Sequence, residues 1–208
     1  MTVTIDEKRL RFTFPENCRS VKYDEWSYYR NQFQNAFGAS KAVDILCITP
    51  NPPTLWLVEV KDYRFYRRTD VMDLGDEVAF KVRDTMAGLL AARIHAGDDS
   101  EKAFAGRAVK TRRIRVVLHL EQPRKHSRLF PRSIDPADMT LKLKQRLKAV
   151  DPHPKIVDHR TLHPDIIWTV EENRPRPSDP GAKSPGPTPT TTRTSTGPRP
   201  SWTRTVEL

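Results

Sequence analysis

An acidic and a basic residue stand two positions apart at the end of an apolar segment, in the sequence Glu59-Val60-Lys61. The preceding residues, 54–58, are short and rich in Leu, Val and Trp, which favours a β-strand over a helix. Because side chains alternate along a strand, Glu59 and Lys61 share one face with the other odd-numbered positions. A buried charge costs free energy unless it is paired or bound to a metal. The spacing therefore indicates either a site of chemistry or a strand that surfaces at its end.

A second carboxylate, Asp44, interrupts a second apolar segment at residues 42–49. A Pro-rich turn, residues 50–53, joins this segment to the strand that ends in Glu59. If the turn folds the two strands into an antiparallel pair, Asp44 comes close to Glu59 and Lys61. Two adjacent carboxylates repel unless a cation lies between them, and Mg²⁺ or Mn²⁺ suits such oxygen ligands. Lys61 could then hold or polarise a water molecule beside a phosphate.

The elements that must position these residues are predicted from hydrophobic periodicity. We expect strands over residues 8–14, 42–49, 54–60 and 113–120, short strands within 155–158 and 165–170, and helices over 23–37, 76–95 and 135–150. The first helix would bury Trp26, Tyr29, Phe33 and Phe37, and the second Val78, Val82, Met86, Leu89 and Leu90. Asp135 is the expected N-cap of the last helix. This order of elements predicts an α/β fold with a mixed sheet flanked by helices.

Composition divides the chain and suggests a partner. The 208 residues carry 36 Lys and Arg against 26 Asp and Glu, a net charge of +10. From residue 173 onward Pro, Thr, Ser, Gly and Arg dominate, so we expect a domain over residues 1–172 and a disordered tail over 173–208. The basic balance favours nucleic acid as partner. We find no membrane-spanning stretch and expect a cytoplasmic protein with reduced thiols at Cys18 and Cys47.

Asp44, followed by Glu59-Val60-Lys61 at the end of a neighbouring strand, resembles the PD-(D/E)xK nuclease superfamily over residues 23–120. The resemblance implies a restriction-endonuclease-like αβββαβ core and metal-dependent hydrolysis of phosphodiester bonds, here by a Mg²⁺-dependent deoxyribonuclease. It makes Asp44 and Glu59 the metal ligands, with the Val60 carbonyl as a third ligand. It also makes Lys61 the catalytic lysine and Glu25, in the first helix, an optional upstream acid.

The sequence departs from the superfamily pattern at two points. Val43 stands before Asp44 where the pattern has proline. Only residues 37–41 separate the expected first helix from the strand of Asp44. The first strand of the core is therefore missing, fused with the next strand, or supplied by residues 8–14.

Several functional alternatives stay open at this point. In the preferred hypothesis basic side chains hold the DNA backbone, and the candidates are Arg64, Arg67, Arg68, Lys81 and Arg83. The main alternative is a module of the same fold that binds nucleic acid or assists assembly without turnover. A protein partner in defence or DNA processing is a further expectation, and the Pro-rich tail could dock an aromatic groove of a partner. RNA or DNA, single or double strands, and endonuclease or exonuclease action are not distinguished.

Overall fold

The computed structural model describes residues 2–65, 68–123 and 134–173. The predicted tail beyond Asn173, the basic segment 124–133 and the candidate contact residue Arg67 lie outside these ranges. All the described residues belong to one structural unit, Met1–Arg174.

A five-stranded mixed sheet carries the two segments that hold Asp44 and Glu59. Its order is β3-β4-β5-β6-β7, with β3 at Arg19–Lys22, β4 at Ile45–Thr49, β5 at Thr54–Asp62, β6 at Arg113–Glu121 and β7 at Lys155–Val157. Strands β3, β4 and β5 are antiparallel neighbours, whereas β5, β6 and β7 run parallel. The mixed sheet and the antiparallel β4–β5 pair are therefore confirmed.

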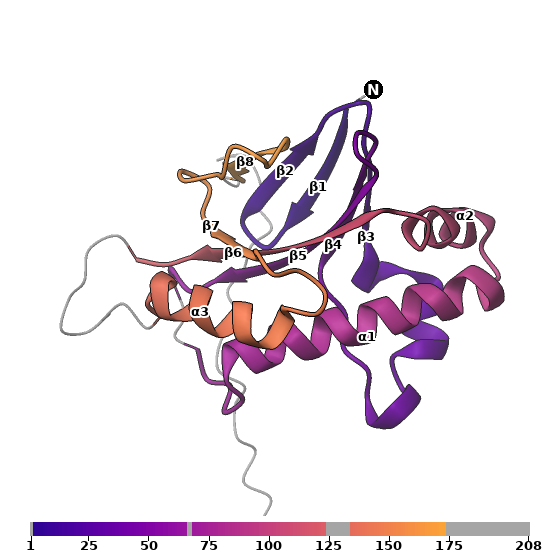
Figure 1. Ribbon diagram of the computed structural model, residues 1–208, viewed down its shortest axis with the longest axis horizontal. Helices are drawn as coiled ribbons and strands as arrows, with labels where there is room; N and C mark the ends of the chain where they lie inside the picture. The colour runs from indigo at the N-terminus through magenta and orange to yellow at the C-terminus, as the bar shows by residue number, and fades with distance from the viewer. Residues whose placement is uncertain (1, 66–67, 124–133, 174–208) are drawn as a thin grey trace, which may run out of the picture. The chain divides into compact units, whose positions relative to one another are not determined.

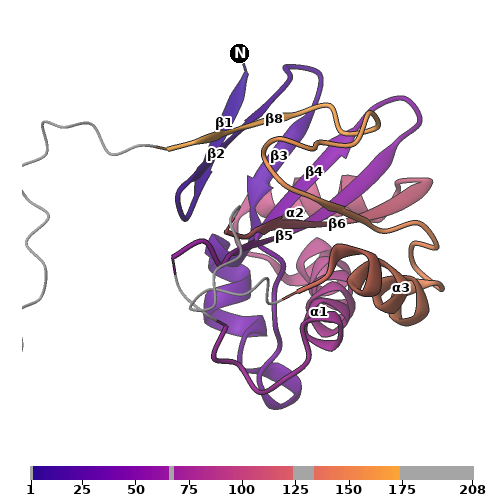
Figure 2. The same ribbon diagram turned by 90° about the vertical axis from the view of Figure 1, so that its left-hand side faces the viewer.

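A second sheet covers one face of the first, where we had expected helices. It has the order β1-β2-β8, with β1 at Val3–Glu7, β2 at Leu10–Phe14 and β8 at Thr169–Glu172. Figure 2 shows this small sheet on one side of the five-stranded sheet, and helices α1 and α3 on the other side. The expectation of a sheet flanked by helices thus holds for one face only.

Three helices pack on the opposite face: α1 at Leu74–His95, α2 at Asp99–Ala108 and α3 at Pro136–Leu147. The N-cap of α3 is Asp135, as predicted, and its side chain accepts a hydrogen bond from the Ala137 N–H. Asp73 caps α1 in the same way. The sequence analysis did not predict α2. No helix within the described ranges is long and apolar enough to cross a membrane.

Strand β5 is buried on both faces, and its alternation separates two apolar cores. Leu55 and Leu57 pack with residues of α1 in one core. Trp56, Val58 and Val60 pack in the other core against the small sheet. The predicted faces of β5 are confirmed, and Glu59 and Lys61 accordingly lie on the helix side.

The expected helix over residues 23–37 is replaced by three short helical turns. These are η1 at Tyr23–Glu25, η2 at Tyr29–Phe33 and η3 at Ala36–Gly38. One cause is the Glu101 carboxylate of α2, which accepts hydrogen bonds from the N–H groups of Ser27 and Tyr28. It satisfies donors that a continuous helix would pair internally. Phe37 has a positive φ of 53° and is 90% exposed, so its expected burial is wrong.

The structure also changes two further predictions. The strand that precedes the helical turns and pairs with β4 is β3, and not residues 8–14, which form β2 of the small sheet. On α1, Val78, Val82 and Leu89 are buried as expected, but Leu90 is 56% exposed. Neither change moves Asp44 or Glu59 from the β4–β5 pair.

The helical turns rest on α1 at a glycine. A β-carbon added at Gly88 would lie 2.2 Å from the Tyr23 hydroxyl oxygen and 3.2 Å from the Phe33 ring. Tyr23 is fully buried, so neither ring can move outward without opening the core. Gly88 therefore sets the distance at which residues 23–33 pack on α1.

We expect Gly88→Ala to lower the free energy of unfolding by ~1–3 kcal/mol, because the extra methyl group overpacks the contact. Urea denaturation followed by circular dichroism measures this loss. Gly106→Ala on α2 is the matched control, because a β-carbon there meets no atom within 4 Å. It should be neutral or stabilising by ~0.5 kcal/mol. Equal stability of Gly88→Ala and the native protein would contradict the packing assigned to Gly88.

Candidate functional site

Asp44 and Glu59 meet where β4 begins and β5 ends. Asp44 immediately precedes β4, and its Oδ2 accepts a hydrogen bond from the Val60 N–H at 2.6 Å. Glu59 lies in β5 on the helix side and is 1% exposed. The structure therefore brings together the two carboxylates that the sequence placed side by side.

Two lysines neutralise Glu59. Its Oε1 lies 2.6 Å from the Lys81 Nζ and 3.1 Å from the Lys61 Nζ. Lys81 comes from α1, and its ammonium also lies 3.8 Å from Asp44 Oδ1. Glu59 Oε2 is buried and has no hydrogen-bond partner within the described residues. An ammonium group thus stands between the two carboxylates.

Glu77 of α1 extends this row of alternating acidic and basic side chains. Lys61 Nζ donates to Glu77 Oε1 at 2.5 Å, and the other Glu77 oxygen accepts a hydrogen bond from Arg68 at 2.9 Å. Each carboxylate in the row has a cation beside it, as a buried charge requires. We call this set the lysine–carboxylate cluster, and its members are Asp44, Glu59, Lys61, Arg68, Glu77 and Lys81.

Burial and mutual attraction set the protonation states of the cluster. Burial, together with the nearby Asp44, raises the pKa of Glu59 to about 7, although Lys81 and Lys61 oppose the rise. Burial lowers the pKa of Lys61, but Glu59 and Glu77 outweigh this and raise it overall. The pKa of Lys81 is raised in the same way, mainly by Glu59. Both lysines therefore carry a proton near neutral pH and act as cations rather than as bases.

One oxygen of each predicted carboxylate ligand and the Val60 carbonyl are engaged by donors, whereas Glu59 Oε2 has no hydrogen-bond partner within the described residues. Glu59 Oε1 accepts a hydrogen bond from Lys81, and Asp44 Oδ2 accepts one from the Val60 N–H. The Val60 carbonyl accepts a hydrogen bond from Lys8 Nζ at 2.5 Å. Within the described ranges no group of three or more His, Cys, Asp or Glu side chains could hold a metal ion. A metal ion does not fit this arrangement unless Lys81 moves away, and Mg²⁺ binding stays a prediction.

Asp24, next to the predicted Glu25 in the helical turns, is an acid whose pKa is raised in part by Asp44 of the cluster. Glu25 is half exposed and pairs with Lys22 at 2.9 Å. Burial raises the pKa of Asp24 to about 6, and the charges of Asp44 and Glu7 add to the rise. Asp24 Oδ1 is buried and without a partner within the described residues. The sequence prediction took Glu25 as an acid in the first turn of an expected continuous helix, and the structure has the separate turn η1 there.

The predicted nucleic-acid contacts are mostly engaged in ion pairs. Arg64 pairs with Asp62 and Glu172, and its side chain is 11% exposed. Arg68 and Lys81 belong to the lysine–carboxylate cluster. Arg83 is exposed but pairs with Asp84. Among the described candidates, therefore, none presents a cation without a carboxylate partner.

A second buried polar group lies on β6 beside the last residue of β5, on the side of the small sheet. Glu121 of β6 accepts hydrogen bonds from His119 at 2.9 Å and from His159 at 2.8 Å. Burial alone would raise the pKa of Glu121, but these hydrogen bonds lower it to about 2. Because Glu121 is hydrogen-bonded to His159, it joins β6 to the segment that leads towards β8.

Comparison with known proteins gives one partial similarity. The chain is 35% identical over 177 residues to a cysteine–tRNA ligase of Neisseria meningitidis serogroup A. The matched region is 70% of this chain, and the chain spans 24% of the ligase. No family model matches the chain. No solved structure matches it.

The similarity contradicts the predicted enzymatic activity. A Mg²⁺-dependent deoxyribonuclease was expected, together with the descriptions nuclease, hydrolase and endonuclease, whereas the matching protein is named as a tRNA ligase. We therefore withdraw the deoxyribonuclease assignment. The comparison does not test the individual roles predicted for Asp44, Glu59 and Lys61, which stay predictions.

We expect Lys81→Met to be destabilising, and more so at about pH 8 than at about pH 5. Loss of the ammonium leaves Glu59 beside Asp44, so the pKa of Glu59 rises further. A carboxyl with a raised pKa binds more protons in the folded than in the unfolded state. Stability is therefore lost as the pH rises from the pKa of the unfolded carboxyl to the raised pKa of the folded one. Removal of one partner of a buried pair costs ~3–5 kcal/mol when the other is ionised. Urea denaturation at both pH values measures the difference.

The matched control is Lys102→Met on α2, where the lysine is exposed and forms no ion pair with a described residue. An equal loss of stability at both pH values would contradict the role given to Lys81. The same variant tests the predicted metal ligands. Mg²⁺ should raise the melting temperature of Lys81→Met more than that of the native protein, and Asp44→Asn in the Lys81→Met background should remove the gain. Absence of any gain would count against Asp44 and Glu59 as metal ligands.

Proposed function

We propose that this chain is an RNA-binding module with a restriction-endonuclease-like core, and that it contacts RNA phosphates through a basic surface at the end of α2. The observation that carries the proposal is the contrast between paired and unpaired cations. The lysines and the arginine of the lysine–carboxylate cluster are all paired with acids. The cations at the end of α2 form no ion pair with any residue that the structure describes.

The order of strands supports the core. Strands β3, β4 and β5 form an antiparallel meander, and the helices α1 and α2 then lead to β6, which is parallel to β5. Asp44 stands at the start of the middle strand and Glu59-Val60-Lys61 at the end of the third. These strands agree with the strand part of the implied core if β3 is its first strand, whereas the helical turns lie between β3 and β4 and not before the first strand.

Four cations follow one another where α2 ends and β6 begins. Arg107, Lys110, Arg112 and Arg113 are exposed, and none forms an ion pair with a described residue. We call them the α2–β6 basic surface. Turn hydrogen bonds fix the backbone between them, with Lys110 N–H bonded to the Arg107 carbonyl and Arg112 N–H to the Pro53 carbonyl. A fixed group of unpaired cations is suited to a polyanion, because phosphates can replace the missing acids.

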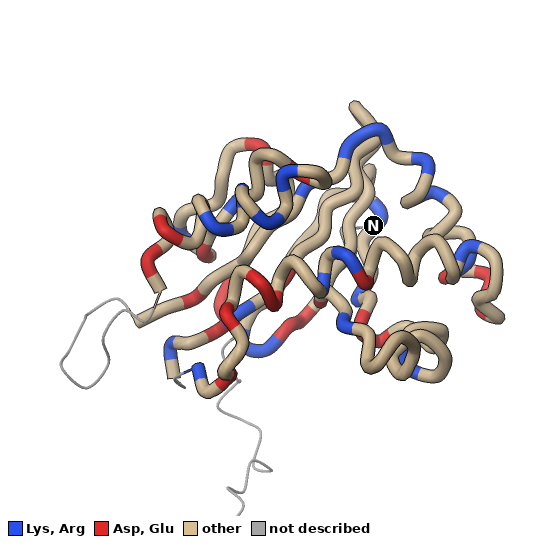
Figure 3. Tube along the Cα trace, turned by 60° about the horizontal axis from the view of Figure 1, so that its bottom comes forward, with Lys and Arg blue, Asp and Glu red and all other residues tan. Residues whose placement is uncertain are grey.

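The presence of Lys and Arg does not by itself distinguish the α2–β6 basic surface from other parts of the chain. Figure 3 shows Lys and Arg interspersed with Asp and Glu over much of the described chain. Most of the described cations at the end of β5 and on the first half of α1 have a carboxylate within ion-pair distance. An ion pair within the protein has to be broken before its cation can serve a phosphate fully, so unpaired cations bind nucleic acid at lower cost.

RNA is favoured over DNA by the partial similarity to a protein whose name includes tRNA. The ligase reaction is not carried over, because the chain spans only 24% of that protein. A module that binds RNA without turnover agrees with the cluster geometry, in which Lys81 holds the space between the two carboxylates.

We expect the full chain to bind a tRNA transcript and a short single-stranded RNA with an affinity that falls steeply with salt. In the variant Lys110→Gln/Arg112→Gln/Arg113→Gln the slope of log affinity against log salt should decrease by ~2–3, because each lost phosphate contact removes ~0.7–0.9. Fluorescence anisotropy across a salt series measures both quantities.

The matched control is Arg93→Gln/Lys144→Gln/Lys148→Gln, which removes the same amount of charge from exposed positions on α1, on α3 and at the C-cap of α3. It should change the slope much less. A duplex DNA of equal length serves as competitor. The proposal fails if RNA does not bind at low salt, if DNA binds more tightly than RNA, or if both triple variants weaken binding equally.

A further inference from the structure

A cavity opens beside the free edge of β3, next to the α2–β6 basic surface. Its volume is about 390 Å³, and residues of β1, β3, η1–η2 and α2 line it. Strand β3 is the edge strand of the five-stranded sheet, so only β4 pairs with it there. The cavity is therefore bounded by a sheet edge and a helix, away from the lysine–carboxylate cluster.

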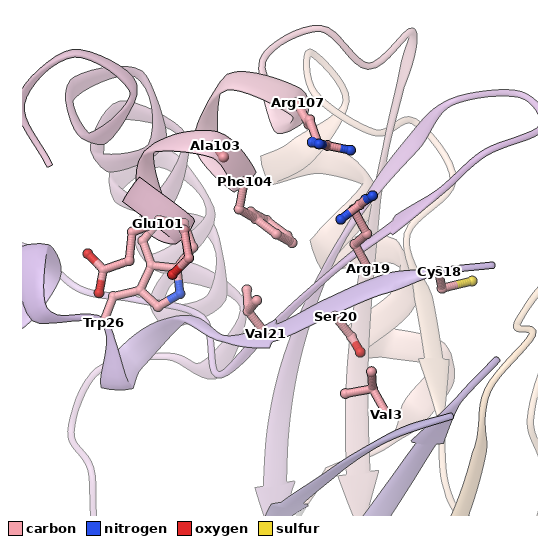
Figure 4. A pocket seen from close by; sticks show the side chains of 11 residues that line it. Val3, Cys18, Arg19, Ser20, Val21, Trp26, Glu101, Ala103, Phe104 and Arg107 are labelled. Carbon is pink, nitrogen blue, oxygen red and sulfur yellow. The ribbon is translucent and has the colours of Figure 1, made fainter. Parts of the chain in front are cut away.

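Two arginines stand over this cavity. Figure 4 shows Arg19 of β3 and Arg107 of α2 with their guanidinium groups directed towards each other. Both are exposed, and neither guanidinium group is hydrogen-bonded or ion-paired to a described residue. Two facing cations repel unless an anion lies between them, and a guanidinium group matches the geometry of phosphate oxygens.

Among the described residues that line the cavity, the one carboxylate is Glu101, and its oxygens are already hydrogen-bonded to backbone groups. Glu101 accepts the N–H hydrogen bonds of Ser27 and Tyr28 at 2.6 and 3.0 Å. In Figure 4 its oxygens point away from the two arginines. The cavity therefore has a positive rim, and the acid does not compete for the arginines.

The inner wall is apolar and aromatic. Trp26 and Phe104 meet edge to face with ring centroids 5.6 Å apart, and Val21 and Val3 continue the wall. The indole nitrogen of Trp26 has no hydrogen-bond partner among the described residues, and Figure 4 shows it turned into the cavity. A flat group with hydrogen-bond acceptors suits this wall.

We propose that the cavity binds one nucleotide unit of the RNA, with its phosphate between Arg19 and Arg107 and its base against the wall formed by Trp26 and Phe104. The inference rests on the proposed function, because it assigns the RNA a second contact beyond the basic surface. Arg107 belongs to both, so the two contacts are continuous. The same chemistry would admit a free mononucleotide, and the experiment separates the two sources.

The test uses the full chain labelled with ¹⁵N, and adenosine monophosphate, inorganic phosphate and RNA as probes. Adenosine monophosphate should shift the Trp26 indole N–H resonance, and inorganic phosphate should compete with it. Short RNAs with a terminal 5′-phosphate or 5′-hydroxyl show whether an end or an internal phosphate is held. Arg19→Gln should weaken binding of the mononucleotide about tenfold, the ~1.4 kcal/mol of one charge-assisted hydrogen bond. Arg93→Gln, an exposed arginine outside the cavity, is the control and should have no effect.

The outcomes separate this inference from the proposed function. Arg19 lies outside the α2–β6 basic surface, so a loss confined to Arg19→Gln reports on the cavity. RNA binding without any shift of the Trp26 resonance, or with full mononucleotide affinity in Arg19→Gln, overturns the cavity assignment and leaves the proposed function standing. Mononucleotide binding without RNA binding overturns the proposed function, and with it the RNA as source of the nucleotide. Absence of both overturns both.

Discussion

A carboxylate inside the sheet constrains the rest of this structure. Glu59 is 1% exposed in a strand buried on both faces, so its charge has to be compensated by neighbouring side chains. Lys61 comes from the same strand and Lys81 from α1, and Glu77 of α1 holds Lys61 in turn. The ion pairs therefore fix how α1 lies along β5, in addition to the apolar contacts between them. Displacement of α1 along its axis by one turn would separate several charges from their partners at once.

Ion pairing also distinguishes the basic residues near β5, which are paired with acids, from those at the end of α2. Cations close to β5 and the first half of α1 stabilise the fold through ion pairs. Because neighbouring carboxylates compensate their charge, they attract an external phosphate only weakly. Cations at the end of α2 form no ion pair with a described residue, and their field extends into solvent. Total net charge would not have distinguished these groups. The division explains why basic side chains near the carboxylates are weaker candidates for RNA contact than more distant ones.

Prediction from the sequence worked where structure depends on neighbouring residues. The β4–β5 pair follows from a short turn between two apolar segments, and the start of α3 follows from the cap at Asp135. The helix expected over residues 23–37 failed because Glu101, distant in sequence, satisfies N–H groups within it. The small sheet was missed because β8 pairs with β2 from the opposite end of the described chain.

The candidate site was predictable to the same extent. Asp44 and Glu59 come together through a local strand pair, which the sequence could indicate. The position of Lys81 between them depends on how α1 packs, and an exposed lysine on a helix looks the same in sequence as a buried one. Glu25 was predicted as an acid in the first turn of a continuous helix, and the structure has the separate turn η1 at that place.

The small sheet also has a consequence for synthesis of the chain. Trp168 lies just before β8 and packs on Trp56 of β5 with ring centroids 5.4 Å apart. A ribosome delivers β5 long before it delivers Trp168, and non-local pairs of this kind form late. Until then, part of the apolar face of β5 and one edge of β2 lack their cover in the nascent chain. Transiently exposed apolar surface and unpaired strand edges favour aggregation, so the pairing of β8 with β2 ends the period in which this face is open to other chains.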